Sequence, residues 1–483
     1  MKKLITSVLV AALLLVTLPM SLISCSDSSK LNRMDEAERA VAFYEMVEEN
    51  ADSAKSGTVK QKQYLKLDIG EMTYEQEDEC ISTYVNQDGE VSLLEQITTT
   101  IWSGGEKRVI YTDEGYVNGM MFTYNKEGTA VSKLKSAMTW NEYEAFRDNQ
   151  TEKVPPLRVG EGFCTTMTCK QADDGTWTAT YEDFTEEGMK YFRYIVRSIE
   201  TALNAEHTFR DVRLTFVADE KLYPVSQKLE FLFDEAEDAD TRVPVITIDL
   251  EFEGLNNTVF SEEYDISDFT EVEDLRTVEN FTSALNDRMS ADSGAFTVTT
   301  KVNATYAGES NKTNVVQEVT YKNHNGYEFT LDYTQDGYEV AISSKKGNVS
   351  TVVREAETGT VVERYTESIT DFEAQATMQQ LMNSENISAL DIIDVEITDA
   401  ENGIYRFTLG DSVKNALNEQ YEYAYGSKID TFHGHIVATV VEGKLMSYTY
   451  HVSTSLQVEG QTMSITVDYT VVFTDLIEDG AMV

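Results

Sequence analysis

Apolar and polar residues alternate along several stretches of this chain with a period of two, which is typical of strands in a sheet with one face in water. The clearest stretch is residues 296–306, where Phe296, Val298 and Val302 alternate with threonine, lysine and asparagine. Residues 59–69 show a similar alternation. The pattern predicts antiparallel sheets, each with an apolar side that other elements must cover.

Apolar residues recur at the helical spacing of three and four positions in a second set of segments. Asp35, followed three residues later by Glu38, has the pattern of a helix N-cap, and Thr277 and Asp411 begin two of the other segments. The predicted helices cover residues 35–47, 189–199, 277–289 and 411–424.

Short turn sequences separate the predicted strands. Asp174-Gly175 and Asn402-Gly403 favour hairpin turns, and Asp219-Glu220 and Glu442-Gly443 occupy similar places between later strands. The predicted order is helix, strand meander, helix, strand meander, and this order occurs twice.

The chain also resembles itself at long range, as an internal repeat does. The segment "ENADSAKSGTVK" around Asp52 reappears as "RMSADSGAFTVT" around Asp292, an offset of 240 residues. Three pairs follow in the same order, "ADDGTWTATYED" with "AENGIYRFTLGD", "VADEKL" with "VVEGKL" and "ITID" with "ITVD", at offsets of 228, 223 and 219 residues. These matches predict two tandem copies of one domain, residues 33–268 and 272–477.

The N-terminus has the pattern of a secretion signal, with a basic start and an apolar run over residues 4–18 that is too short to span a membrane stably. The sequence "LISC", which ends at Cys25, resembles the bacterial lipobox. The resemblance implies a signal peptide of residues 1–24, cleavage between Ser24 and Cys25, and diacylation of Cys25. Two acyl chains anchor a protein stably, and residues 25–32 are expected to be a flexible tether.

The charge of the chain excludes some classes of partner, and its cysteine content limits the disulfides it can form. The chain has 39 Lys and Arg against 84 Asp and Glu, a formal net charge of −45, which becomes −47 when the two lysines of the signal peptide are removed. So acidic a surface repels nucleic acid and anionic lipid headgroups. Cys80, Cys164 and Cys169 remain besides the lipobox cysteine, and their odd number argues against a disulfide scaffold. A five-residue spacing puts Cys164 and Cys169 on opposite faces of a continuous strand.

The order of lipobox, helix, long meander, inserted helix and last meander resembles the lipoprotein-carrier superfamily of LolA/LolB-like and LppX-like proteins. Eight strands at about 4.8 Å spacing are roughly 38 Å wide, whereas two helices cover about 20 Å. Such a sheet must therefore curl, expose apolar surface or enclose space. The resemblance implies an α+β fold with two tandem copies of a strongly curved antiparallel sheet, a half-barrel, each covered by two helices and able to hold acyl chains. No ligand-binding residue carries over, because the lipobox is the only motif that matches.

These features predict a membrane-anchored extracytoplasmic lipoprotein that binds or carries a hydrophobic ligand such as a lipid. A non-catalytic adaptor, structural or sensory role at the bacterial cell surface is the alternative. In "GMMFTY", Met120 and Met121 are candidates for an adaptable apolar pocket and equally for ordinary core. No G-x-S-x-G, P-loop or G-x-G-x-x-G motif occurs at a strand-to-helix junction. No enzyme activity and no cofactor are therefore expected, and an enzyme built on Asp, Glu and Tyr stays open as a further alternative.

The chain has five histidines, His207, His324, His433, His435 and His451. His433 and His435 are two residues apart, so a strand would point both imidazoles to one face, as a metal site requires. If Glu442-Gly443 is a two-residue turn, His451 pairs opposite Gly434 and lies on the other face. A three-histidine cluster is then not expected, although a three-residue loop would reverse this conclusion.

Acidic residues give weaker signals. The run "DEAEDAD", Asp234 to Asp240, lacks the ligand spacing of an EF-hand and is expected to be a solvated loop. Asp249 and Asp468 hold equivalent positions in the two copies and are expected to be outward-facing strand residues and not a catalytic pair. The sequence thus predicts no metal site.

Overall fold

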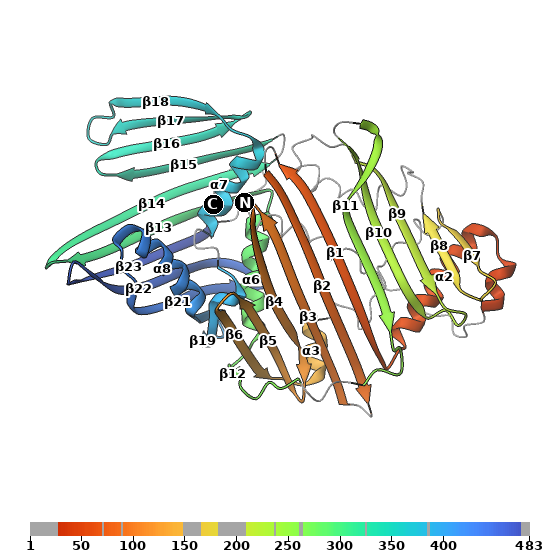
Figure 1. The fold of residues 1–483 in the computed structure, drawn as a ribbon. Coiled ribbons are helices and arrows are strands. Elements are labelled where there is room, and N and C mark those ends of the chain that lie inside the picture. Colours follow the sequence, from red (N-terminus) through yellow and green to blue (C-terminus); the bar gives the residue numbers. More distant parts are fainter. Residues whose placement is uncertain are drawn as a thin grey trace. The chain divides into compact units, whose positions relative to one another are not determined.

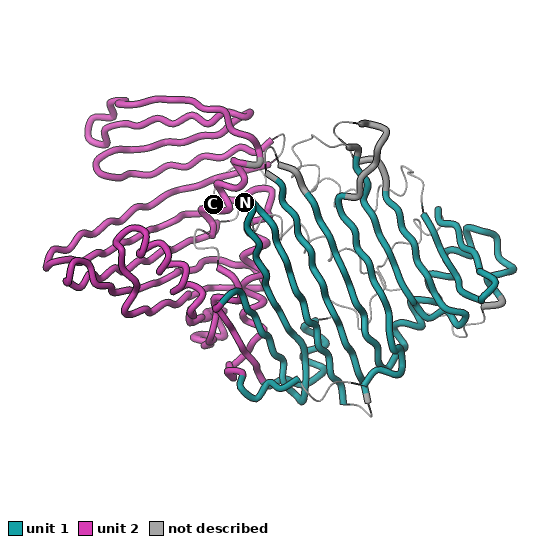
Figure 2. The backbone as a smooth tube through the Cα atoms, viewed as in Figure 1, with its two compact units in different colours: residues 1–128, 137–268 teal, residues 129–136, 269–483 magenta. Residues whose placement is uncertain are grey.

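The computed structural model describes residues 28–69, 72–87, 90–147, 166–181, 209–235, 238–259, 264–323, 326–383 and 387–474. The chain divides into two compact units (Figure 2), residues 1–128 with 137–268 and residues 129–136 with 269–483. The predicted signal peptide, Ser24 and Cys25 lie outside the described residues, so lipidation of Cys25 stays a prediction.

The first sheet has twelve strands in the order β12-β6-β5-β4-β3-β2-β1-β11-β10-β9-β8-β7 (Figure 1). β12 lies parallel to β6, whereas β1 lies antiparallel to both of its neighbours, β2 and β11. The strand bounds are β1 (Ser56–Ile69), β2 (Met72–Gln87), β3 (Glu90–Ser103), β4 (Glu106–Val117), β5 (Met120–Glu127), β6 (Ala130–Ala137), β7 (Thr168–Gln171), β8 (Trp177–Tyr181), β9 (Phe209–Ala218), β10 (Pro224–Glu235), β11 (Asp238–Glu253) and β12 (Thr270–Glu271).

The second sheet has eleven strands in the order β18-β17-β16-β15-β14-β13-β23-β22-β21-β20-β19. Its strand bounds are β13 (Ser293–Tyr306), β14 (Glu309–Asn323), β15 (Tyr327–Gln335), β16 (Tyr338–Lys345), β17 (Asn348–Glu355), β18 (Val361–Ser368), β19 (Ile392–Asp399), β20 (Ile404–Leu409), β21 (Ile429–Val441), β22 (Lys444–Val458) and β23 (Gln461–Thr474).

Apart from β12, the two sheets have the same strand order. In each, a meander of six strands and a meander of five strands meet where the first strand pairs with the last, β1 with β11 and β13 with β23. Lys62 faces Asp249 at the first junction, and Lys301 faces Asp468 at the second. The internal similarity of the sequence thus corresponds to a repeat of the complete sheet topology.

Five α-helices are described, and two of them were not predicted. They are α2 (Glu36–Asp52), α3 (Trp140–Arg147), α6 (Arg276–Ser290), α7 (Asp371–Met382) and α8 (Asp411–Tyr425). α3 precedes β7 and α7 precedes β19, so they are equivalent additions to the predicted order. The expectation of two helices per copy is therefore wrong for the second unit, where three are described. Residues 189–199, predicted as a helix, lie outside the described residues.

The helices missed by the sequence analysis both begin with a capping box. Thr139 precedes α3, and its hydroxyl and backbone N–H both bond Glu142. Thr370 precedes α7 and makes the same pair of bonds to Glu373. The two threonines are 231 residues apart, which fits the series of offsets found in the sequence. This T-x-x-E signal could have revealed both helices.

Helix α2 begins as predicted and helps to fill the core of the first unit. Asp35 caps it, accepting a 2.9 Å hydrogen bond from the Glu38 N–H. Phe43 is fully buried and meets Phe216 edge-on, with ring centroids 5.6 Å apart. The predicted tether is wrong in its second part, because residues 28–33 form a short 3-10 helix, η1 (Ser28–Arg33), and Leu31 is fully buried.

Helix α6 has a similar role in the second unit. Val278, Phe281 and Leu285 of the predicted apolar stripe are buried, and Phe281 stacks on Phe407 with ring centroids 5.0 Å apart. The cap differs from the prediction, since the N-cap is Leu275 and Thr277 lies within the helix. A second 3-10 helix, η2 (Ala389–Asp391), precedes β19.

Two large, mostly antiparallel sheets with five described helices fit the α+β class, but the predicted half-barrels are wrong. Both sheets are open and larger than half-barrels, with twelve and eleven strands (Figure 1). The predicted eight strands per copy are fewer than the structure has, and the prediction also lacked the helices α3 and α7. Tyr143 of α3 is buried and packs on Tyr116 of β4, with ring centroids 5.2 Å apart. Because α3 covers inner surface that the prediction left bare, the sheet need not close on itself.

Candidate functional site

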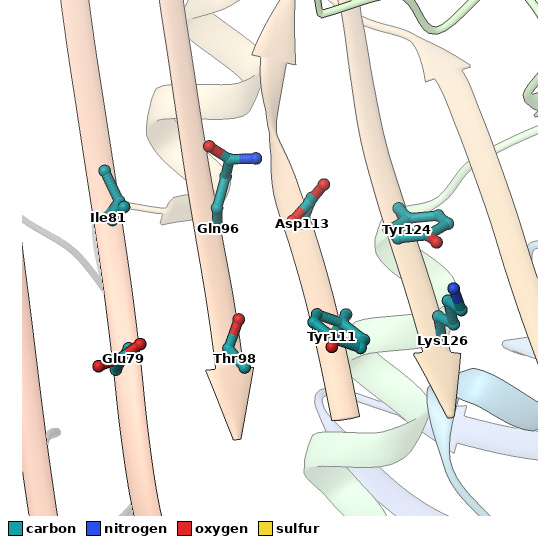
Figure 3. Close-up of a pocket in the computed structure, with 8 residues that line it drawn as sticks. All are labelled: Glu79, Ile81, Gln96, Thr98, Tyr111, Asp113, Tyr124 and Lys126. Carbon is teal, nitrogen blue, oxygen red and sulfur yellow. The ribbon is translucent and has the colours of Figure 1, made fainter. Parts of the chain in front are cut away.

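A shallow hollow of about 370 Å³ lies on the face of the first sheet that points away from α3 (Figure 3). Arg147 of α3 bonds Glu95 and Glu114 on the inner face. Successive strand residues point to opposite faces, so their neighbours Gln96 and Asp113 point outward. We call the hollow the outer dish. Its lining residues are Glu79, Ile81, Gln96, Thr98, Tyr111, Asp113, Tyr124 and Lys126.

The outer dish consists of two rows of side chains across β2, β3, β4 and β5. The first row contains Glu79, Thr98, Tyr111 and Lys126, and the adjacent row contains Ile81, Gln96, Asp113 and Tyr124. Strands lie about 4.8 Å apart, and successive residues on one face lie about 6.8 Å apart. The rigid sheet therefore presents its eight side chains on a grid of roughly 14 by 7 Å.

Asp113 is held in place by a residue from a distant part of the first unit. The Tyr264 hydroxyl donates a 2.8 Å hydrogen bond to Asp113 Oδ2. Burial raises the pKa of the Asp113 carboxyl, and hydrogen bonds from Tyr264 and Gln96 act in the opposite direction. Tyr264 also packs on Phe122, with ring centroids 5.1 Å apart. Tyr264 thus borders the second row of the dish.

Tyr111 supplies an accessible aromatic ring, because it is 42% exposed. Lys126 Nζ lies 5.8 Å from the centroid of this ring, within the range of a cation–π interaction. In the same row, Glu79 pairs with Lys62 Nζ of β1 at 3.2 Å. Lys62 also pairs with Glu77, at 3.0 Å. The dish thus combines ring, hydroxyl, amide and carboxyl groups with one lysine.

An ion cluster around the buried Arg147 supports the dish from the inner face. Arg147 Nη1 lies 2.9 Å from Glu114 Oε1, and Arg147 Nη2 lies 2.5 Å from Glu95 Oε2. Burial raises the pKa of Glu95, and the attraction of Arg147 opposes this effect. The cluster fixes β3 and β4 to α3 one residue away from Gln96 and Asp113.

The two described cysteines and the two methionines singled out in the sequence are not among the lining residues of the dish. Cys80 and Cys169 are free thiols, and burial raises the pKa of both to about 12, so both stay protonated at neutral pH. Cys164 lies outside the described residues. Met121 is buried with 2% exposure, in keeping with a core role, and Met120 is half-buried.

Three histidines share one face of the second sheet, so the predicted register is wrong. The turn at Glu442-Gly443 has two residues, as expected, but the register shifts between Thr439 and Val440. His435 therefore faces His451, and Gly434 faces Val452. His433 lies two residues from His435 on the same strand face. His207 and His324 lie outside the described residues.

Gly403 contacts β21 at Val440, next to this register shift. The Val440 N–H donates a 2.9 Å hydrogen bond to the Gly403 carbonyl in the turn between β19 and β20. A Cβ atom on Gly403 would lie 2.0 Å from the Val440 carbonyl oxygen, so only glycine permits this approach. The contact comes from residues 37 positions apart, and no local sequence pattern indicates it.

The acidic residues are dispersed over different elements. Asp249 faces Lys62 across strands and also lies 3.9 Å from Lys228 Nζ, whereas Asp468 Oδ1 lies 2.6 Å from His451 Nδ1. The run from Asp234 to Asp240 is not a single loop, because β10 extends to Glu235 and β11 begins at Asp238. The side chains of this run lie outside the described part of the structure.

The described residues contain no group of three or more His, Cys, Asp or Glu side chains placed to hold a metal ion. No helix among them is long and apolar enough to cross a membrane.

Comparisons with known proteins leave the family open. No family model matches the chain, and no curated protein matches it. Among solved structures, a DUF1329 family protein from Desulfovibrio piger is 11% identical, with 41% of this chain and 91% of that chain covered and a TM-score of 0.15. A mutant of transferrin binding protein B from Haemophilus parasuis is 5% identical, with 87% and 76% covered and a TM-score of 0.16. At such TM-scores these likenesses carry no argument about fold or function.

Proposed function

We propose that this chain is a lipid-anchored extracytoplasmic protein that binds a hydroxyl-rich, sugar-like ligand in the outer dish without altering it chemically. The lipobox resemblance at Cys25 supports the location. The two-row arrangement of the outer dish supports the binding role, and it is the observation on which the proposal rests.

The chemistry of the dish matches that of a saccharide. The C–H face of a sugar ring can pack on the exposed ring of Tyr111, and Tyr124 lies in the adjacent row. Adjacent sugar hydroxyls can donate to Asp113 and accept from Gln96, which face each other across β3 and β4. Because Tyr264 already holds the Asp113 carboxyl, little side-chain entropy is lost on binding.

The predicted hydrophobic ligand has less support than a sugar-like one. The inner side of the first unit is filled where it is described, by fully buried aromatic side chains that include Phe43, Trp177 and Phe216. The outer dish has polar groups in both rows. A lipid chain offers no hydrogen-bond donor or acceptor to the polar groups that line the dish, whereas sugar hydroxyls offer both.

The test is a binding screen with the chain from residue 26 onward, produced without its lipid anchor. Saturation-transfer NMR against neutral di- and tetrasaccharides of glucose, galactose, mannose and N-acetylglucosamine identifies a ligand, and calorimetry gives its affinity. Tyr111→Ala and Asp113→Ala should each weaken binding at least tenfold. Tyr338→Ala is the matched control, because Tyr338 is also 42% exposed but lies on β16 of the second sheet.

Two results would contradict this proposal. One is the absence of binding to every saccharide in the screen. The other is lipid retained by the folded protein in native mass spectrometry, which would favour the predicted carrier of a hydrophobic ligand.

The adaptor alternative is favoured by one separate observation. Strand β18 ends the order of the second sheet, and Val361, Val362 and Tyr365 on it are 45–49% exposed. An edge strand with exposed apolar side chains can pair with a strand of a partner protein. Replacing Val362 by Pro should abolish capture of such a partner in crosslinking at the cell surface, and unchanged capture would exclude β18 as the contact.

A further inference from the structure

The second sheet gathers histidines on the face opposite its helix contacts. Thr454 of β22 is buried and bonds the Tyr421 hydroxyl of α8, so His451, an odd number of residues away, points to the other face. His435 lies directly across from His451, and His433 is its neighbour on the same face of β21. Three of the five histidines in the chain thus lie within two adjacent strands.

Distances within this group are short. The rings of His435 and His451 have centroids 4.7 Å apart. On the other side of His451, its Nδ1 atom lies 2.6 Å from Asp468 Oδ1 on β23. A carboxylate bonded to one ring nitrogen fixes the tautomer and orientation of an imidazole and leaves the other nitrogen, here Nε2, to act as a ligand.

We propose that His433, His435 and His451 form a binding site for a first-row divalent transition-metal ion such as Zn²⁺, with Asp468 as a positioning residue. Two histidines at positions i and i+2 of one strand and a third across the ladder supply three nitrogen ligands, and water can complete a tetrahedron. The site is independent of the outer dish and of its ligand.

Metal binding requires the imidazoles to turn. As the side chains stand in the described residues, no three ligands are placed to hold an ion. The Cα atoms of directly paired residues are about 4.5–5.5 Å apart, and those of i and i+2 about 6.8 Å apart. The proposal requires rotation about the side-chain torsions of His433 and His435 that brings three ring nitrogens to 2.0–2.1 Å from one ion. His433 is exposed to solvent.

Nearby charges act on this site in both directions. Lys301 faces Asp468 from β13, and Arg406 of β20 faces Val437, two residues from His435. Glu396 of β19 in turn faces Arg406. The two cations near the histidines repel a metal ion, so an ion held by charge alone is disfavoured here. Binding must therefore rely on nitrogen ligands. Zn²⁺ and Cu²⁺ prefer such ligands, whereas Ca²⁺ and Mg²⁺ prefer oxygen.

The experiment titrates the chain from residue 26 onward with Zn²⁺ by calorimetry, in excess Mg²⁺ that occupies the many surface carboxylates. We expect one Zn²⁺ per chain. His435→Asn and His451→Asn should each weaken binding at least tenfold, and Asp468→Asn about tenfold or more. Val437→Thr, on the same face of β21, is the control and should leave the affinity unchanged.

A second measurement identifies the ligands. With Cu²⁺ as the probe, electron paramagnetic resonance should show hyperfine coupling to nitrogen that is lost in His435→Asn. The proposal is overturned if Zn²⁺ binding is absent in excess Mg²⁺, or if it persists unchanged in both histidine variants, because the ion would then be held by carboxylates elsewhere.

Discussion

At the scale of single residues, the first unit depends on charges that are buried beneath the outer dish. Arg147 holds Glu95 and Glu114 on the inner face, and Asp78 lies in a chain of side chains on β2. Tyr74 donates to Gln76 at 2.6 Å, and Gln76 donates to Asp78 Oδ2 at 2.7 Å. Sequence patterns did not indicate these groups, because the alternation of apolar and polar residues predicts that every Glu or Gln of a strand faces solvent.

Replacing Arg147 by Leu should lower the free energy of unfolding by about 3–5 kcal/mol, because the buried carboxylate of Glu95 loses its partner and the half-buried Glu114 loses the same partner. Urea denaturation measures this change. Arg108→Leu is the control, since Arg108 and its partner Glu127 are 34% and 28% exposed and such a pair contributes about 1 kcal/mol or less. Equal losses in the two variants would show that the Arg147 cluster does not support the sheet.

Asp78→Asn should raise the free energy of unfolding at neutral pH. Burial raises the pKa of Asp78 above 3.8 in the folded state, against the effect of hydrogen bonds from Thr99 and Gln76. An acidic group whose pKa is higher in the folded state than in the unfolded state stabilises the fold at pH values below its pKa in the unfolded state. This stabilisation is lost as the pH rises through its pKa in the folded state. The advantage of the variant should therefore appear as pH rises above 3.8 and vanish below it, and an advantage independent of pH would contradict this origin.

At the scale of elements, local sequence patterns predict most of the strands but not the register in which they pair. The alternation over residues 296–306 and the cap at Asp35 correspond to β13 and the start of α2. The shift between Thr439 and Val440 belongs to the pairing of β21 with β22 and not to the pattern of either strand alone. The outer dish is equally non-local, because each of four strands contributes only two residues to it.

The capping boxes of α3 and α7 provide a test at this scale. Thr370→Ala should lower the free energy of unfolding by about 1 kcal/mol, because the N–H of Glu373 loses its partner. Thr377→Ala, within α7, is the control, and its effect should be about zero or slightly stabilising because alanine favours helix. Chemical denaturation measures both, and an equal loss in the two variants would contradict the role of the cap.

At the scale of the whole molecule, the two sheets repeat one topology, although the sequence matches that reveal the repeat are short. The second unit also includes residues 129–136, which the sequence analysis assigned to the first copy. Ser132 Oγ donates a 2.6 Å hydrogen bond to the Ile392 carbonyl, and Ser136 Oγ accepts from the Leu275 N–H. The pattern of hydrophobic residues does not indicate that this one strand of the first sheet belongs to the second unit.

A fragment of residues 269–474 should therefore fold less stably than the second unit of the complete chain. Without β6, strand β12 loses its pairing partner, and the Leu275 N–H loses its acceptor. Thermal unfolding should show a lower midpoint for the fragment. A fragment with the same midpoint would show that residues 129–136 contribute little to the second unit.

The central claim is that the outer dish binds a sugar-like ligand, and a crystal structure of the chain from residue 26 onward with the saccharide found in the screen tests it most directly. We predict a sugar ring packed on Tyr111, with hydroxyls bonded to Asp113 and Gln96. Saccharide bound elsewhere on the chain, with the outer dish occupied by solvent alone, would contradict the claim.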